Sequence, residues 1–132
     1  SYLENFIELQ ELREDHNRIR LNVVIAPYAT GNYMIAPFVL IPFIENAFKH
    51  VSHFSQQNEI RISLSRNENR FMLTVFNTKD RREVNGTHAG IGLKNVKRRL
   101  ELLYEHRHQL VIEDGPESFE IKLDLEINGD TV

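Results

Sequence analysis

The sequence of 132 residues contains no cysteine and no tryptophan. Without cysteine, a disulfide framework and any metal site built on thiolates are excluded. An excess of positive charge is also missing, because 16 Lys and Arg stand against 19 Asp and Glu, for a net charge of −3. Nonspecific binding of nucleic acid depends on such an excess. We therefore expect no nucleic acid among the partners.

Long apolar runs are absent as well. The longest, from Met34 to Ile44, contains two prolines and is far shorter than the roughly 20 residues that a membrane-spanning helix needs. No signal peptide or internal repeat is visible. An apolar content of 41% and a charged content of 27% are typical of a globular protein. The length favours one domain with a substantial hydrophobic core.

The segment 37–51 is predicted to be a helix with two distinct faces. Its apolar residues recur at spacings of four, three and four and form one stripe: Leu40, Ile44, Ala47 and Val51. Asn46, Lys49 and His50 share a different face within one turn. An amide oxygen can ligate Mg²⁺ and an ammonium group can contact phosphate, so this face suits a metal-bridged polyphosphate. The alternative is an ordinary solvated face, on which Lys49 pairs with Glu45.

Periodicity predicts the other elements. A helix is expected over residues 2–15 and another over 92–104; strands are expected over 20–25, 59–65, 70–76, 109–113 and 118–127. Residues 78–91 have no periodicity and are predicted to form a long loop that acts as a lid. This order favours an α+β fold, a two-layer sandwich in which a mixed, mostly antiparallel sheet carries its helices on one face.

Two further features point to a ligand near the predicted lid. Asn77 stands at the end of a strand that is expected to be buried, directly before the lid. Gly90 and Gly92 lead from the lid into the next helix, whose predicted buried stripe is Leu93, Val96, Leu100 and Leu103. Glycine lets the backbone approach a ligand closely, and a helix N-terminus offers free N–H groups to phosphate. Glycine before a helix is, however, commonly only part of a turn.

Two long motifs carry a resemblance to a known family. They are Pro42-Phe-Ile-Glu-Asn-Ala-Phe-Lys-His50 and Gly90-Ile-Gly-Leu-Lys-Asn-Val-Lys-Arg-Arg-Leu100. Both resemble hallmarks of the ATP-binding catalytic domain of LytS-like sensor histidine kinases. That domain belongs to the superfamily of DNA gyrase B, the Hsp90 chaperones, the histidine kinases and MutL. The resemblance extends from about Tyr2 to Ile127 and implies a Bergerat-type ATP-binding fold.

The resemblance implies roles for the residues of the first motif. Asn46 matches the residue that ligates the Mg²⁺ bridging the phosphates of ATP, and Glu45 is expected to help position the metal or its waters. These two residues are the expected catalytic residues. Lys49 matches a position that contacts phosphate, and His50 matches a position that packs near the adenosine.

Asn77 matches the residue that binds the adenine amino group. Gly90, Gly92 and Leu93 match the second glycine box, which lies at the phosphate end of the nucleotide. The expected cofactors are therefore ATP and Mg²⁺.

The chain departs from the family pattern at three positions. Asn77 replaces an aspartate and Lys79 replaces a glycine, while His88 stands where the second glycine box often opens with glycine. An asparagine can accept the hydrogen bond of the adenine amino group, but it can also donate one. Pro42 stands where gyrase-type ATPases carry the glutamate that activates water, which disfavours a hydrolytic ATPase.

The expected function is that of a catalytic domain in a two-component sensor histidine kinase. It would transfer the γ-phosphoryl group of ATP to a histidine on an upstream dimerisation and phosphotransfer domain, and from there to a response regulator. Residues 1–18 are expected to end a linker or dimerisation helix, with the ATP-binding domain over 19–132. The fragment is expected to be soluble and cytoplasmic, and the full-length protein to be a homodimer in the cell membrane.

Two other functions stay open at this point. One is a degenerate, non-catalytic scaffold module, which the substitutions at Asn77, Lys79 and His88 motivate. The other is a stand-alone ATPase of the same superfamily, which Pro42 argues against.

Overall fold

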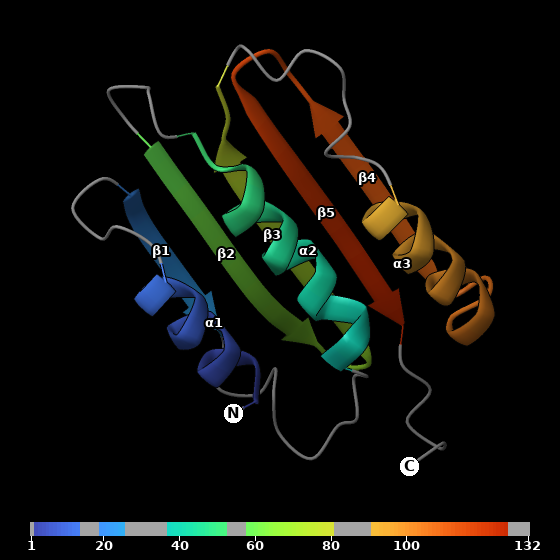
Figure 1. Cartoon of the computed structure of the whole chain (residues 1–132). Coiled ribbons are helices and arrows are strands. Elements are labelled where there is room, and N and C mark those ends of the chain that lie inside the picture. The colour runs from blue at the N-terminus through green and yellow to red at the C-terminus, as the bar shows by residue number, and fades with distance from the viewer. Residues whose placement is uncertain (1, 14–18, 26–36, 53–57, 81–90, 127–132) are drawn as a thin grey trace.

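The structure is a computed structural model that describes residues 2–13, 19–25, 37–52, 58–80 and 91–126. Within these ranges, three helices and five strands follow one another in the order that the sequence predicts. All three helices lie on one face of a single sheet, as Figure 1 shows. The predicted α+β class and the two-layer arrangement are therefore confirmed.

The element boundaries lie within a few residues of those expected. The helices are α1 (Tyr2–Arg13), α2 (Pro37–His50) and α3 (Ile91–Leu103), and the strands are β1 (Ile19–Ile25), β2 (Asn58–Asn67), β3 (Arg70–Thr78), β4 (His108–Asp114) and β5 (Ser118–Glu126). The largest differences are at the ends of β2 and β3, which each continue two residues beyond the predicted strand ends at residues 65 and 76. None of the described helices is long and apolar enough to cross a membrane.

The sheet has the strand order β1-β2-β3-β5-β4. β1 runs parallel to β2, whereas all other neighbours are antiparallel, so the sheet is mixed and mostly antiparallel. β2 and β3 form an antiparallel hairpin, and its turn holds Glu68 in the left-handed region at φ 57°. β5 lies between β3 and β4 and is therefore one of the central strands of the sheet (Figure 1).

Alternation along the three central strands places one row of apolar side chains against the helices. The buried set is Ile60, Ile62 and Leu64 on β2, Phe71, Leu73 and Val75 on β3, and Phe119, Ile121, Leu123 and Leu125 on β5. Side chains between them on these strands are exposed or half-buried. Burial of each large apolar side chain contributes about 1.5–3 kcal/mol, so this row is a main source of the free energy that holds the helices on the sheet.

α2 is the middle helix of the helical layer and is the most deeply buried. Its predicted stripe is confirmed, because Leu40, Ile44, Ala47 and Val51 are all buried. Val39, Phe43 and Phe48 are buried as well. The apolar surface is wider than one stripe because α2 packs against the sheet and also against α1 and α3.

The predicted stripe of α3 is correct at three of its four positions. Leu93, Val96 and Leu100 are buried, but Leu103 is 43% exposed, so its predicted burial was wrong. Tyr104 is the first residue after the helix, and it covers this end of the core with only 9% exposure. The chain turns there, since the Arg107 amide donates to the Tyr104 carbonyl.

α1 is part of the same hydrophobic core. Leu3 and Ile7 are buried among the residues of α2 and the sheet, and α1 packs beside α2 (Figure 1). Residues 14–18 lie outside the described ranges, so the expected domain boundary after residue 18 stays a prediction.

Two neighbouring residues of β3 test the assignment of the sheet faces. Leu73 faces the helices and is 1% exposed, whereas Met72 faces away from them and is 53% exposed. We expect Leu73→Ala to lower the free energy of unfolding by about 2–5 kcal/mol and Met72→Ala to change it by no more than about 0.5 kcal/mol. Urea denaturation measures both, and equal losses would contradict the assignment.

Candidate functional site

The polar face of α2 carries the residues that the first motif singled out. Glu45 and Lys49 are exposed, and Asn46 and His50 are half-buried. These side chains lie on the last turns of the helix, where the cationic Lys49 also suits the negative end of the helix dipole. The helix can present them because its other sides are held by the apolar contacts with the sheet and the two flanking helices.

Asn46 has a buried amide nitrogen, Nδ2, that makes no hydrogen bond within the described part of the chain. Leaving such a group unpaired is costly, and buried polar atoms in native proteins are nearly always satisfied by protein, water or ligand. The half-buried amide of Asn46 therefore fits a residue that has a ligand or ordered water as its partner.

A metal ion at Asn46 would need most of its ligands from outside the described part of the chain. Among the residues that the structure describes, no group of three or more His, Asp or Glu side chains could hold a metal ion. Mg²⁺ commonly takes only one or two protein oxygens and fills its octahedron with phosphate oxygens and waters. A single amide oxygen from Asn46 is compatible with that kind of site.

Asn77 lies within β3 and not after it, and it is 1% exposed. Its side-chain nitrogen donates to the Thr78 carbonyl at 2.9 Å. No described residue donates to the other end of the amide, Oδ1. The sequence alone leaves open whether this asparagine donates or accepts, but in the structure its donor is engaged and its oxygen remains as the acceptor.

A buried polar cluster of Ser52, Asn58 and Thr78, which we call the polar clamp, joins three elements. The Ser52 hydroxyl donates to Asn58 Oδ1 at 2.5 Å and lies 2.7 Å from the Thr78 hydroxyl. Because Ser52 gives its one hydroxyl proton to Asn58, the 2.7 Å contact is made by donation from Thr78, whose other acceptor, the Glu59 carbonyl, is more distant at 3.4 Å. The Thr78 hydroxyl in turn accepts from the Glu59 amide at 2.9 Å, and the Thr78 carbonyl accepts from the Ser52 amide at 2.8 Å.

The polar clamp holds the two halves of the candidate site at fixed positions. Ser52 follows the helix that carries Asn46, and Thr78 follows Asn77 directly. Sequence reasoning missed this cluster, because Ser52 and Asn58 lie between the predicted helix 37–51 and the predicted strand 59–65, and Thr78 lies in the predicted lid. Ser52 and Asn58 are in fact buried, at 0% and 7% exposure. Their local composition resembles that of a loop and gives no signal of these partners.

The segment between β3 and α3 is described only at its ends. Residues 81–90, including the predicted Gly90, the substitution His88 and most of the predicted lid, lie outside the described ranges. Gly92 lies in the first turn of α3, and Leu93 is buried in the core. The described structure therefore places the second half of the glycine box at a helix N-terminus, as expected.

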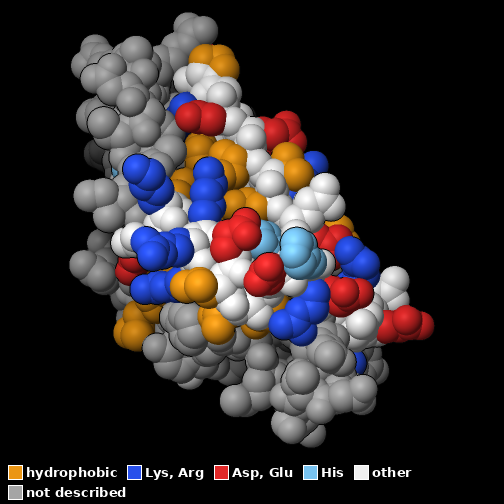
Figure 2. All heavy atoms as spheres, turned by 90° about the vertical axis from the view of Figure 1, so that its right-hand side faces the viewer, with side chains coloured by type: hydrophobic (Ala, Val, Ile, Leu, Met, Phe, Trp, Pro, Cys, Tyr) orange, Lys and Arg blue, Asp and Glu red, His pale blue; other side chains and the backbone are white. Residues whose placement is uncertain are grey.

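Positive charge gathers on the exposed side of α3. Lys94, Lys97 and Arg98 are all exposed, and Figure 2 shows Lys and Arg side chains together on this side of the molecule, apart from most of the Asp, Glu and His. Cations near a helix N-terminus oppose the helix dipole. Only Lys94, the fourth residue of α3, lies near that end; Lys97 and Arg98 lie in the middle of the helix, so the charge runs along its exposed side.

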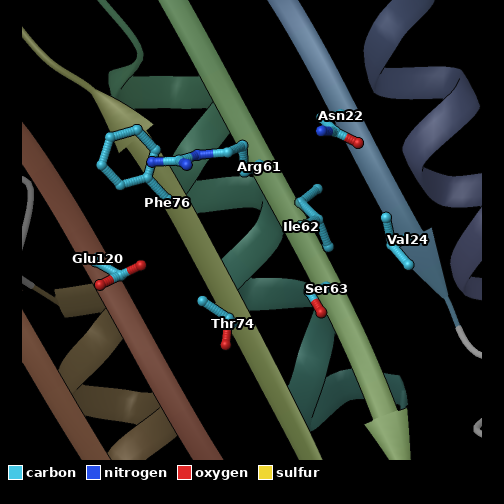
Figure 3. A pocket seen from close by; sticks show the side chains of 8 residues that line it. All are labelled: Asn22, Val24, Arg61, Ile62, Ser63, Thr74, Phe76 and Glu120. Carbon is cyan, nitrogen blue, oxygen red and sulfur yellow. The ribbon is translucent and has the colours of Figure 1, made fainter.

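A shallow hollow on the opposite face of the sheet is separate from these residues. It is lined by Asn22, Val24, Arg61, Ile62, Ser63, Thr74, Phe76 and Glu120, from four neighbouring strands. In Figure 3 the side chain of Arg61 extends toward the ring of Phe76, while α2 passes behind the strands. The Arg61 guanidinium lies 4.1 Å from the ring centroid. None of the predicted site residues lines this hollow.

Comparison with protein families gives one match. A family model described as the GHKL domain matches residues 37–126, from the start of α2 to the end of β5. The matched range includes both motifs and the whole polar clamp. Comparison with curated protein sequences finds no match.

Solved structures of histidine kinases share the fold. The histidine kinase domain of a blue-light-activated kinase from Erythrobacter litoralis has a TM-score of 0.69 at 12% identity, covering 96% of this chain and 59% of that one. The histidine kinase AdeS from Acinetobacter baumannii has a TM-score of 0.68 at 15% identity, covering 96% of this chain and 64% of that one. Full-length ShkA, solved with AMPPNP, has a TM-score of 0.64 at 18% identity, covering 93% of this chain and 28% of that one. The chain thus spans less than two thirds of each of these three proteins.

The polar clamp can be tested by removing one hydroxyl. Thr78→Val leaves Ser52 without its hydrogen-bond donor and the Glu59 amide without its acceptor. We expect a loss of about 1–3 kcal/mol in the free energy of unfolding. Thr74→Val is the matched control, since Thr74 is half-buried on the same face of the same strand but its hydroxyl makes no hydrogen bond with a described residue; this variant should change stability by no more than about 0.5 kcal/mol. Similar small changes for both variants in urea denaturation would mean that the clamp does not stabilise the domain.

Proposed function

The chain belongs to the GHKL domain family, and on that premise we propose that it is the ATP-binding catalytic domain of a two-component sensor histidine kinase. The observation that supports this most directly is Asn46, whose half-buried amide nitrogen lacks a partner in the described structure. It lies on the helix with which the family match begins, and the polar clamp links that helix to the strand of Asn77.

At the phosphate end of the proposed site, Asn46 would hold Mg²⁺ through its amide oxygen. Bound Mg²⁺ would supply positive charge that offsets part of the negative charge of the phosphates. Lys49 is exposed on the same face, where its long side chain can reach phosphate as a mobile point charge. Glu45 orients the metal or its waters. Gly90 and Gly92 bring the backbone of the lid and the N-terminus of α3 close to the phosphates.

At the base end, Asn77 accepts a hydrogen bond from the exocyclic amino group of adenine. The engaged Nδ2 supports this role, because it leaves the oxygen as the available atom. His50 packs near the adenosine, and Leu93 supports the start of α3 from within the core. The structure of ShkA with AMPPNP shows that a protein of this fold binds an adenine nucleotide analogue, which agrees with the assignment.

The proposed reaction is transfer of the γ-phosphoryl group to a histidine on an upstream dimerisation and phosphotransfer domain. The bond from the γ-phosphorus to ADP breaks as a bond to the histidine nitrogen forms. Such a transfer depends on in-line positioning and charge stabilisation more than on a general base. Pro42, one turn before Asn46, has no group that could activate water, which favours transfer over hydrolysis.

The wider assembly follows from the same resemblance. We propose that the full-length protein is a homodimer in the cell membrane and that its phosphohistidine donates to an aspartate on a response regulator. The described residues of this chain support only the nucleotide-binding step. The dimer, the membrane location and the response regulator rest on the resemblance.

The metal role of Asn46 can be tested by titration. Asn46→Ala should abolish the Mg²⁺-dependent part of the affinity for an ATP analogue, and Asn46→Asp should alter it, because the residue faces the site and not the core. The control is Asn67→Ala, at the exposed end of β2. Isothermal titration calorimetry with and without Mg²⁺ measures the affinity, and circular dichroism checks the fold. Equal Mg²⁺-dependent binding by Asn46→Ala and the wild type would remove Asn46 from the site.

Phosphoryl transfer can be tested with γ-labelled ATP. Residues 1–132 should bind ATP without labelling themselves, since the proposed acceptor lies on another domain. Joining the upstream segment with its histidine should restore an acid-labile label within a dimer. Acid-labile label on residues 1–132 alone would mean that the acceptor has been misplaced. If the chain does not bind nucleotide at millimolar concentration, the scaffold alternative would be favoured.

A further inference from the structure

Lys79 is a buried lysine at the end of β3, where the family resemblance leads one to expect a glycine. Its side chain is 7% exposed. A lysine seldom lies at such depth without a partner, because the desolvated ammonium group must be compensated. The partner is therefore informative about what this substitution does.

Asp114, the last residue of β4, is that partner and forms an ion pair with the Lys79 ammonium group. β5 lies between β3 and β4, so the lysine side chain crosses a strand to reach the carboxylate. The backbone of Lys79 is bound on the same side, because its amide donates to the Glu117 carbonyl at 3.0 Å. The pair of Lys79 with Asp114 is charge-assisted, and hydrogen bonds of that kind are stronger than neutral ones.

The direction in which Lys79 points matters because of Asn77. Asn77 is buried on the helix side of β3, and Lys79 is buried directly after the last residue of that strand. The bond from the Lys79 amide to the Glu117 carbonyl continues the pairing of β3 with β5, so strand alternation places the two side chains on the same face. Two residues along a strand correspond to roughly 7 Å, which a lysine side chain can reach across. A released ammonium group would find the unengaged Oδ1 of Asn77 as an acceptor and would compete with any ligand for it.

We infer that Asp114 is a specificity-determining positioning residue, which holds the Lys79 ammonium group away from Asn77 so that Asn77 Oδ1 stays available to an amino group on the ligand. This inference rests on the proposed nucleotide site. It accounts for a lysine in place of glycine without loss of the base site. It also predicts a change in base preference, which general loosening of the fold would not produce.

The test compares binding of ATP with binding of inosine triphosphate, which has a carbonyl oxygen where adenine has its amino group. The wild type should prefer ATP. In Asp114→Ala the released lysine should occupy Asn77 Oδ1 and can donate to the inosine carbonyl. We expect the ratio of the two affinities to fall roughly tenfold, the value of about one hydrogen bond. Calorimetric titration in the presence of Mg²⁺ measures both affinities.

Two further variants separate this effect from a loss of stability. Asp124→Ala is the matched control, because Asp124 pairs with Arg70 at the far end of β3, at 3.3 Å, and its loss should leave the ratio unchanged. Lys79→Met combined with Asp114→Ala removes the released cation and should restore the preference for ATP. If Asp114→Ala does not fold, Asp114→Asn keeps the side-chain shape and should shift the ratio in the same direction by less.

An unchanged ratio in a folded Asp114 variant would overturn the inference even if both affinities fall, because only a structural role would then remain. Failure of the double variant to restore the ratio would overturn it as well. If the wild type binds neither nucleotide, the proposed function fails and the inference falls with it. The outcomes of the wild type and of the Asp114 variants therefore distinguish the two failures.

Discussion

The Thr78 hydroxyl is the group on which the geometry of the candidate site depends. It bonds to Ser52 after α2 and to the Glu59 amide at the start of β2, while Thr78 itself belongs to β3. Asn46 and Asn77 lie far apart in the sequence, and apolar packing alone would allow α2 to slide along the sheet. Hydrogen bonds are directional and short, so the polar clamp sets the position of α2 along β3 more sharply than the core can.

Much of the fold could be predicted because its signals are local. The alternation in β2, β3 and β5 and the stripe of α2 follow from burial of one face, which each segment shows by itself. The strand order could not be predicted in this way. Nothing within β5 indicates that it lies between β3 and β4, or within β1 that it runs parallel to β2, because pairing is decided between segments.

The same distinction explains which parts of the site were found. The residue types and spacing of Asn46, Lys49 and His50 indicated a ligand. Lys49 is exposed and the other two are half-buried, and the roles of all three stay predictions. Ser52 and Lys79 were assigned to loops because each is polar and surrounded by polar neighbours. They are buried because Thr78 and Asp114, from other strands, satisfy them, and a partner from another strand leaves no mark on the local pattern.

The departures at positions 77 and 79 are physically coupled through Asp114. An aspartate at position 77 would place a carboxylate roughly 7 Å along the same face from Lys79, where it would compete with Asp114 for the ammonium group. The neutral amide of Asn77 attracts the ammonium group less, so the lysine pairs with Asp114, and Asn77 Oδ1 accepts no hydrogen bond from a described residue. A glycine at position 79 removes this conflict by removing the cation. Lysine at this position therefore fits best with a neutral residue at 77 and an acid at 114, and this chain has both.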